Sequence, residues 1–96
     1  MEQQSANNNP QSKQILYKTQ GTCSQYIEVG LTDGLISSCR FYGGCDGNTK
    51  GLAKLVIGMR PTDVISRLSG ITCGRKPTSC PDQLCQALKQ MQGEDL

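Results

Sequence analysis

The chain contains no histidine and no tryptophan, and it has a single phenylalanine and three tyrosines. Without histidine, catalysis by a Ser-His or Cys-His pair is excluded. The low aromatic content also predicts a thin hydrophobic core for a chain of 96 residues. Because domains of this size often need a metal or disulfides in addition to their core, a second source of stability is expected here.

Long hydrophobic runs and clusters of charge are also missing. No run of about 18 apolar residues is present, so no membrane-spanning helix is expected. The ten Lys and Arg are scattered along the chain, which argues against a nucleic-acid-binding surface. Lys50 and Lys54, on one predicted helix, are interpreted as solvated side chains. We therefore expect neither a membrane nor a nucleic acid as a partner.

The composition divides the chain into three parts. Residues 1–14 are almost wholly polar, so they are predicted to be a disordered lead-in. They lack the basic start and the apolar stretch of a signal peptide, which predicts a cytoplasmic protein. Residues 15–92 are predicted to form one domain, and residues 93–96 a short tail.

Strand patterns occupy the first half of the domain. Residues 15–19 predict a short strand, and residues 26–32 alternate so that every second side chain is apolar. The following Asp33-Gly34 is a strong two-residue hairpin signal. The return strand, residues 35–42, is predicted to place four side chains on one face: Leu35, Ser37, Cys39 and Phe41.

Helical periodicity follows in three segments. The first segment, which Asp46 or Asn48 would cap, is closed by Gly58 and Pro61. Its predicted buried residues have the spacing i, i+3, i+4, i+7: Leu52, Leu55, Val56 and Met59. The second begins at Pro61 and is predicted to bury Val64, Ile65 and Leu68. The third begins in residues 78–82 and is predicted to bury Leu84, Leu88 and Met91. The predicted fold is α+β: a small antiparallel sheet, made of a strand and a hairpin, packed against three helices.

The six cysteines fall into two groups by position. Cys39 lies in the middle of a predicted strand and Cys85 in the middle of a helix, so both are interpreted as small core residues. Four cysteines lie at the ends of elements, among glycines, where binding residues concentrate: Cys23, Cys45, Cys73 and Cys80. Cys80 lies in the first turn of a helix, where the partial positive charge favours the thiolate.

The chemistry of these four thiols leaves alternatives open. Reduced cytosolic thiols more often serve metal binding or redox reactions than structural disulfides. No Cys-x-x-Cys pair is present, so a metal site has to be assembled from distant residues. Thiolates without histidine favour zinc or an iron–sulfur cluster. The alternatives are a thiol redox pair of Cys73 and Cys80, and an interaction module with packing cysteines. Asp46 and Asp82 are interpreted as helix caps.

Residues 78–82 read Thr-Ser-Cys-Pro-Asp and resemble the motif of the TSCPD domain family. Residues 21–24, 43–48 and 70–74 are similar to the other cysteine blocks of small members of that family. The resemblance covers about 75 residues, from Tyr17 to Met91. It implies that the shared cysteines, and the proposed metal ligands, are Cys23, Cys45, Cys73 and Cys80.

The resemblance to this family also implies a biological context. Similar domains occur at the C-terminus of cobalamin-dependent ribonucleotide reductases, so a reductase or another protein is the implied partner. A reductase barrel needs about 250 residues, so this chain is expected not to be catalytic alone. By association, the implied enzyme is ribonucleoside-diphosphate reductase, in deoxyribonucleotide synthesis. From the thiolate donor set we expect zinc as the metal, with an iron–sulfur cluster as the second choice.

The order of elements also resembles that of IscU/NifU-type iron–sulfur scaffold proteins. Cys23, Cys45 and Cys80 match the three scaffold ligands in order. The chain departs from the pattern at Gln25, where the scaffold has aspartate, and at Ser79, where it has histidine. This second resemblance implies a metal site in the same part of the fold.

Overall fold

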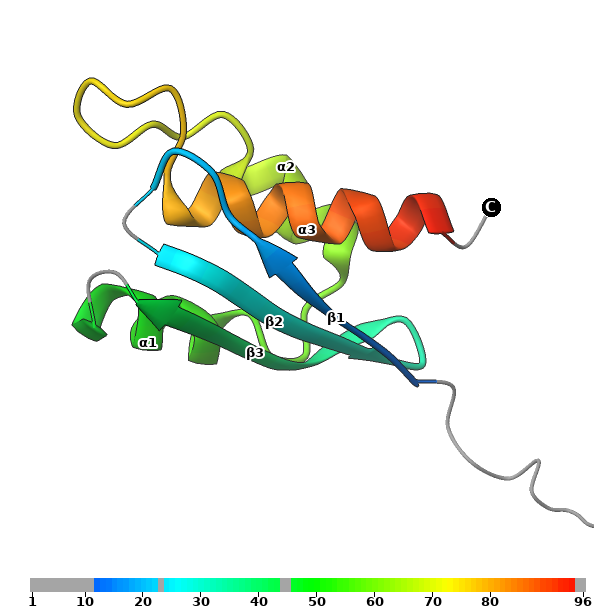
Figure 1. Ribbon diagram of the computed structural model, residues 1–96. Coiled ribbons are helices and arrows are strands. Elements are labelled where there is room, and N and C mark those ends of the chain that lie inside the picture. The colour runs from blue at the N-terminus through cyan, green and yellow to red at the C-terminus, as the bar shows by residue number, and fades with distance from the viewer. Residues whose placement is uncertain (1–11, 23, 44–45, 95–96) are drawn as a thin grey trace, which may run out of the picture.

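The computed structural model describes residues 12–22, 24–43 and 46–94, and Figure 1 shows the arrangement of their elements. The strands are β1 (Ser12–Lys18), β2 (Ser24–Thr32) and β3 (Leu35–Gly43), and the helices are α1 (Asp46–Leu55), α2 (Pro61–Leu68) and α3 (Cys80–Glu94). The strands pair in the order β1-β2-β3, and both pairings are antiparallel. The prediction of a small α+β fold is confirmed.

Two boundaries differ from those expected of the sequence. β1 begins at Ser12, three residues before the predicted start of the domain, because residues 12–14 pair with residues 30–32 of β2. α3 continues to Glu94, into the predicted tail. Residues 1–11 of the predicted lead-in, and residues 95–96 of the tail, lie outside the described part of the chain.

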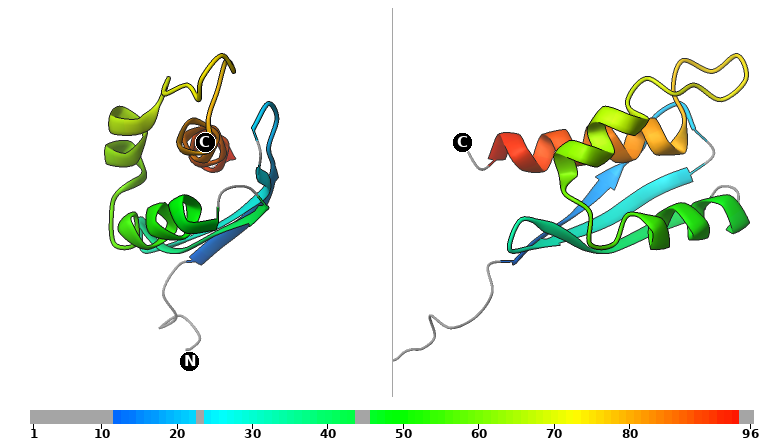
Figure 2. Two further views of the ribbon diagram at one scale, coloured as in Figure 1. Left: turned by 90° about the vertical axis from the view of Figure 1, so that its left-hand side faces the viewer. Right: turned by 180° about the vertical axis from the view of Figure 1, so that it is seen from behind.

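The helices cover one face of the sheet and leave the other face exposed. α3 crosses the sheet, α1 runs along the edge strand β3, and α2 packs against α3 (Figures 1 and 2). The core lies between the sheet and α3, and its buried residues are Ile27, Val29, Leu31, Ile36, Val56, Val64, Leu84, Cys85, Ala87, Leu88 and Met91. No helix in the described residues is long and apolar enough to cross a membrane.

The hairpin between β2 and β3 turns where the sequence predicts it. Asp33 and Gly34 both adopt positive φ angles, 53° and 84°, as a tight two-residue hairpin turn requires. The register then shifts: Leu31 pairs with Ile36 and Gly30 with Ser38, so one residue of β3 has no partner. This bulge reverses the alternation at the start of β3.

The bulge makes one predicted face wrong. Leu35 was expected to share a face with Cys39 and Phe41, but it is 43% exposed, whereas Ile36 is 1% exposed. Cys39 and Phe41 are half-buried against the core as expected. The extra residue in β3 is the physical reason, because every side chain before it moves to the opposite face.

α1 also ends earlier than its apolar spacing predicts. The helix stops at Leu55, which is 72% exposed, while the next residue, Val56, is 1% exposed. The prediction that Leu55 is buried is therefore wrong. The chain leaves the helix in a turn, and its backbone then pairs with β3. The Gly58 amide donates to the carbonyl of Ile36, and the Ile36 amide donates to the carbonyl of Met59.

α3 buries its predicted residues fully, whereas Ile65 and Leu68 of α2 are only partly buried against the core. Pro61 is the first residue of α2, where its missing amide hydrogen costs nothing, and Val64 of that helix is fully buried. In α3, Leu84, Leu88 and Met91 are at most 1% exposed. These residues recur at spacings of four and three, so they form one stripe that faces the sheet.

Candidate functional site

The first turn of α3 is capped by the side chain of Ser79. The Ser79 hydroxyl accepts a hydrogen bond of 3.2 Å from the amide of Asp82, three residues later, as an N-cap residue does. The same hydroxyl donates to the carbonyl of Ile71 at 2.6 Å. Ser79 therefore fixes both the helix that presents Cys80 and the loop that precedes it.

The Asp82 carboxylate holds the preceding loop in place. One oxygen accepts from the amide of Gly70 at 2.7 Å, and the other accepts from the Thr78 hydroxyl at 2.5 Å. The Thr78 and Gly70 hydrogen bonds hold the pKa of the Asp82 carboxyl below its ordinary value. The interpretation of Asp82 as a helix cap is wrong: Ser79 caps the helix, and Asp82 ties the preceding loop to it. The side chain of Asp46 lies outside what the structure describes.

Gln83 connects this turn to the segment between β1 and β2. Its amide nitrogen donates to the Thr78 hydroxyl at 2.9 Å, and its amide oxygen accepts from the backbone of Gln20 at 3.1 Å. Gln83 is 7% exposed, so these bonds form away from bulk water. The start of α3 is thus held against the β1–β2 connection as well as against its own loop.

The Cys80 sulfur lies beside the first residue of β2. Ser24 Oγ and Cys80 Sγ share a hydrogen bond of 2.8 Å, although 56 positions separate them in the sequence. Ser24 is 3% exposed and Cys80 is half-buried. A hydroxyl so placed can donate to a thiolate and orient it, in the way that outer groups support metal ligands.

Cys73 and Cys80 line the same cavity. Cys73 is exposed, in the loop between α2 and α3, where its amide donates to the carbonyl of Thr78. The cavity measures about 300 Å³ and opens between this loop, the start of α3 and the start of α1. Its other lining residues are Asn48, Thr49, Leu52, Ser79 and Pro81. We call it the thiol cavity.

Two of the four predicted ligands, Cys23 and Cys45, lie outside the described residues. Cys23 directly precedes Ser24, which bonds to Cys80, and Cys45 directly precedes α1, which lines the thiol cavity. Within residues 12–22, 24–43 and 46–94, no three Cys, His, Asp or Glu side chains gather as a metal site would require. The structure thus brings Cys73 and Cys80 to one cavity and leaves the positions of Cys23 and Cys45 as predictions.

A family model for the TSCPD domain matches residues 4–92 of the 96-residue chain. The chain belongs to the TSCPD domain family. Comparisons with curated proteins and with solved structures gave no match. In this TSCPD domain, four residues of the motif have distinct roles: Thr78 and Asp82 bond to each other, Ser79 caps the helix, and Cys80 faces the cavity.

The two cysteines that we interpreted as packing residues have a different environment. Cys85 is fully buried in the core of the TSCPD domain, and burial raises the pKa of its thiol. Burial likewise raises the pKa of Cys39 to about 12. Both therefore stay protonated near pH 7, and neither lines the thiol cavity.

Sequence reasoning missed three residues around this site. Ser24 stands in a cysteine block, but nothing in that block indicates a bond to Cys80. The Gln83 contacts join segments 63 positions apart, so no local pattern could reveal them. Thr49 is 6% exposed and lines the thiol cavity from α1. A helical spacing that counts only apolar residues does not include it.

Proposed function

We propose that this TSCPD domain is a metal-binding accessory domain with a four-thiolate site. The proposed ligands are Cys23, Cys45, Cys73 and Cys80, with zinc as the first choice of metal and an iron–sulfur cluster as the second. The observation that carries the proposal is the thiol cavity, because Cys73, in the loop between α2 and α3, and Cys80, at the start of α3, both line it. All four described cysteines are free thiols, so Cys73 and Cys80 are both available as ligands.

The connectivity of the chain supports the inclusion of the other two cysteines. Cys23 directly precedes Ser24, which bonds to Cys80. Consecutive Cα atoms are about 3.8 Å apart. Cys45 is one residue from the start of α1, and three residues from Asn48, which lines the cavity. The chain therefore joins both cysteines directly to segments that contact Cys80 or line the thiol cavity.

The donor set fits a soft metal ion. Four thiolates and no histidine match the sulfur-only sites of zinc and of iron–sulfur clusters, and they suit magnesium or calcium poorly. The Ser24 hydroxyl can stabilise the charge on the Cys80 sulfur and fix its direction. A bound metal would tie the loop that carries Cys73 to the rest of the fold, so it would supply the stability that a thin core lacks.

The family resemblance supports the proposed context. We infer that the domain serves a ribonucleotide reductase as an accessory piece, and that the site has a structural role in that contact. The described part of the cavity offers two thiols, two hydroxyls, an amide and apolar groups, a set that suits holding a ligand. The test of this partner is a pull-down of a purified cobalamin-dependent reductase with the metal-loaded domain.

The metal site is tested by purifying the protein without air and without added metal. We expect about one equivalent of zinc, or iron with matching sulfide and visible absorption, by elemental analysis. Replacement of zinc by cobalt should give thiolate-to-cobalt charge-transfer absorption. Cys73→Ser and Cys80→Ser should each lower the metal content and the affinity.

Cys39→Ala is the matched control, because it removes a thiol that does not line the thiol cavity. It should leave the metal content unchanged. Less than about 0.2 equivalents of zinc plus iron, with all six thiols free, would contradict the proposal. Equal metal loss in Cys39→Ala and Cys80→Ser would contradict the choice of ligands.

One observation favours a second candidate function, a thiol redox partner. Cys73 and Cys80 are free and line one cavity, and Cys73 is exposed. The Cys80 thiolate would attack a disulfide of a partner, form a mixed disulfide and release one thiolate. Cys73 would then displace the second partner thiolate and leave a Cys73–Cys80 disulfide, so two electrons pass to the partner.

The redox candidate is tested by trapping the mixed disulfide. With oxidised glutathione, the Cys73→Ser variant should accumulate one glutathione on Cys80. The unsubstituted protein should form an intramolecular disulfide instead. Mass spectrometry distinguishes the two products. A stable glutathione adduct on the unchanged protein would exclude Cys73 as the resolving thiol. A tightly bound metal that protects both thiols from glutathione would favour the metal site over the redox function.

A further inference from the structure

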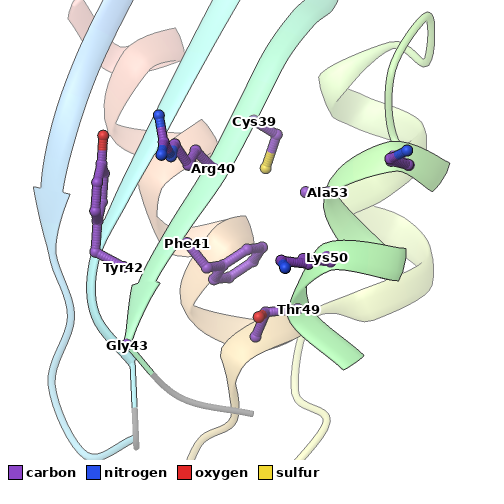
Figure 3. Close-up of a pocket in the computed structure, with 9 residues that line it drawn as sticks. Cys39, Arg40, Phe41, Tyr42, Gly43, Thr49, Lys50 and Ala53 are labelled. Atoms are coloured by element: carbon purple, nitrogen blue, oxygen red, sulfur yellow. The ribbon is translucent and has the colours of Figure 1, made fainter. Parts of the chain in front are cut away.

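The two edge strands of the sheet, β1 and β3, have different neighbours. The strand order is β1-β2-β3, so β1 and β3 each pair with one strand only. Figure 3 shows Cys39 and Phe41 pointing from β3 toward α1, which runs beside that strand. In the left-hand view of Figure 2, α1 and α2 lie on the side of the molecule opposite β1. The outer side of β1 is therefore the edge that these two helices leave open.

The backbone groups on the outer side of β1 follow from its bonds to β2. The Thr19 amide, one residue past β1, donates to the carbonyl of Gln25 at 3.1 Å. The Lys13 carbonyl oxygen also faces β2, because it lies 3.4 Å from the place that a Cβ on Gly30 would take. Backbone groups alternate between the two sides along a strand, so odd-numbered residues bond to β2 and even-numbered residues point outward. The outward residues are Ser12, Gln14, Leu16 and Lys18.

The outward groups form a regular row without partners in the described part of the chain. Among the hydrogen bonds of residues 12–22, 24–43 and 46–94, none outside the pairing with β2 involves the amide or carbonyl of Gln14, Leu16 or Lys18. The pairing with β2 runs along the whole of β1 without a bulge. A straight row of free donors and acceptors is a template to which another strand can add.

The side chains of β1 supply apolar surface on both faces of this edge. On the open face of the sheet, Leu16 is 61% exposed. On the helix face, Ile15 and Tyr17 pack against the core but are only partly buried. An added strand would cover all three side chains, so apolar burial would support the backbone bonds.

We propose that β1 pairs antiparallel with β1 of a second copy of this chain, so that two three-stranded sheets join into one. In the register that uses the whole strand, Ile15 lies opposite Ile15 of the partner subunit, and Gln14 lies opposite the partner subunit's Leu16. Each outward residue then faces an outward residue of the other copy, so their amides and carbonyls can bond to each other.

The sequence of β1 favours a second copy as the occupant of this edge. A two-fold dimer requires one strand to complement itself, and this register places the apolar Ile15 against its own copy at the centre. It also places Lys13 opposite Tyr17 of the partner subunit and Lys18 opposite the partner subunit's Ser12, so like charges do not lie opposite each other. β1 contains none of the proposed metal ligands. Loss of metal binding would therefore leave this inference standing.

The dimer is tested by sedimentation velocity of the full chain from micromolar to millimolar concentration, with a thiol reductant present to exclude disulfide-linked species. Because a strand of seven residues makes a small interface, we expect a Kd on the order of 100 µM. Leu16→Pro removes an outward amide, which an edge strand can lose without breaking a bond to β2. It should weaken the dimer about tenfold or more, since one hydrogen bond is lost in each copy. Leu16→Thr keeps the amide and is the control, with a change in Kd of less than about threefold.

Amide hydrogen exchange of the unsubstituted protein locates the interface independently. The amides of Gln14 and Leu16 should be protected only at concentrations where the dimer forms, whereas those of Ile15 and Tyr17 should be protected at every concentration. This pattern decides the question if circular dichroism shows that Leu16→Pro does not fold. A monomer at millimolar concentration, or an equally strong dimer in folded Leu16→Pro, would overturn the proposal. Protection of the Leu16 amide at every concentration would overturn it as well, because the edge would then be covered within one chain.

Discussion

The two ends of α3 are held in place by different physical interactions. Its first turn is polar: Ser79, Asp82 and Gln83 are at most 8% exposed, and each makes hydrogen bonds to the loop or to the sheet side of the fold. Farther along, the helix is held by apolar packing of fully buried residues, such as Leu84 and Leu88.

Because of this difference, one part of α3 mainly stabilises the fold and the other mainly positions the Cys80 sulfur. Apolar burial is non-directional and scales with area, so it stabilises the helix on the sheet without fixing small rotations. Hydrogen bonds depend on distance and angle, so the polar end sets where the Cys80 sulfur lies relative to Ser24 and Cys73. Substitutions at the apolar end should therefore have the largest effect on the free energy of unfolding. Substitutions at the polar end should have the largest effect on the reactivity of the thiols.

The largest effect on stability is expected at the apolar end. Leu88→Ala removes a fully buried side chain and leaves a cavity between α3 and the sheet, so it should destabilise the fold by about 2–5 kcal/mol. Urea unfolding followed by circular dichroism measures this change. Gln90→Ala, at an exposed position of the same helix, should stay within about 0.5 kcal/mol. Equal effects of the two substitutions would contradict the assigned packing.

The next largest effect is expected at Asp82. Asp82→Asn removes a buried carboxylate that accepts two hydrogen bonds, so it should cost about 1–3 kcal/mol at pH 7. Asp63→Asn, at an exposed position of α2, should cost less than about 0.5 kcal/mol. The difference is measured by urea unfolding.

The effect of Asp82 should depend on pH in a defined direction. The hydrogen bonds from Thr78 and Gly70 lower the pKa of this carboxyl from its ordinary value of 3.8. A lowered pKa in the folded state means that the contribution is complete above the ordinary value and is lost as the pH falls through the folded-state pKa. The difference in the free energy of unfolding between the unsubstituted protein and Asp82→Asn should therefore be constant from pH 7 to about pH 5 and shrink below about pH 4. A gap that grows on acidification would show the opposite linkage.

A smaller change in stability is expected from the helix cap. Ser79→Ala should cost about 1 kcal/mol, because the amide of Asp82 loses its partner and the link to Ile71 is broken. It should also change the rate at which Cys80 reacts with iodoacetamide, since the cap positions that residue. Ser66→Ala, which removes an exposed hydroxyl of α2, serves as the control for both measurements. An unchanged Cys80 rate would mean that the cap stabilises the helix without positioning the thiol.

The smallest change in stability is expected at Ser24. Ser24→Ala removes one hydrogen bond to Cys80, and sulfur is a weak hydrogen-bond partner, so it should cost about 0.5 kcal/mol. Its effect on the thiol should be more specific: the alkylation rate of Cys80 should change, and that of exposed Cys73 should not. Mass spectrometry of the labelled protein measures both rates in one sample. Equal changes at both cysteines would indicate a general loosening of the fold instead.

Local sequence signals predicted the elements because their causes are local. Asp33-Gly34 specifies a tight turn wherever it occurs between alternating strands, and the spacing of Leu84, Leu88 and Met91 fixes the buried side of α3. The bulge before Ser38 has no such signal, because it arises from the pairing of two strands. For that reason the sequence assigned Leu35 to the wrong face.

The candidate site could be predicted only in part. Position at the ends of elements separated Cys73 and Cys80 from the buried Cys85, and the structure places the first two on one cavity. The bond between Ser24 and Cys80 depends on how α3 lies on the sheet, which no local pattern encodes. The interpretation of Lys50 and Lys54 as solvated side chains agrees with their exposure on α1.

The backbone contact of Ile36 with Gly58 and Met59 has a consequence for self-association. β3 is an edge strand, and an exposed edge can add a strand from a second molecule and begin aggregation. The hydrogen bonds from Gly58 to Ile36 and from Ile36 to Met59 occupy that edge near the hairpin. The bulge distorts the strand just beyond it, so an incoming strand finds no regular row of free donors and acceptors there. The early end of α1 thus protects the hairpin end of the β3 edge against pairing with a second strand.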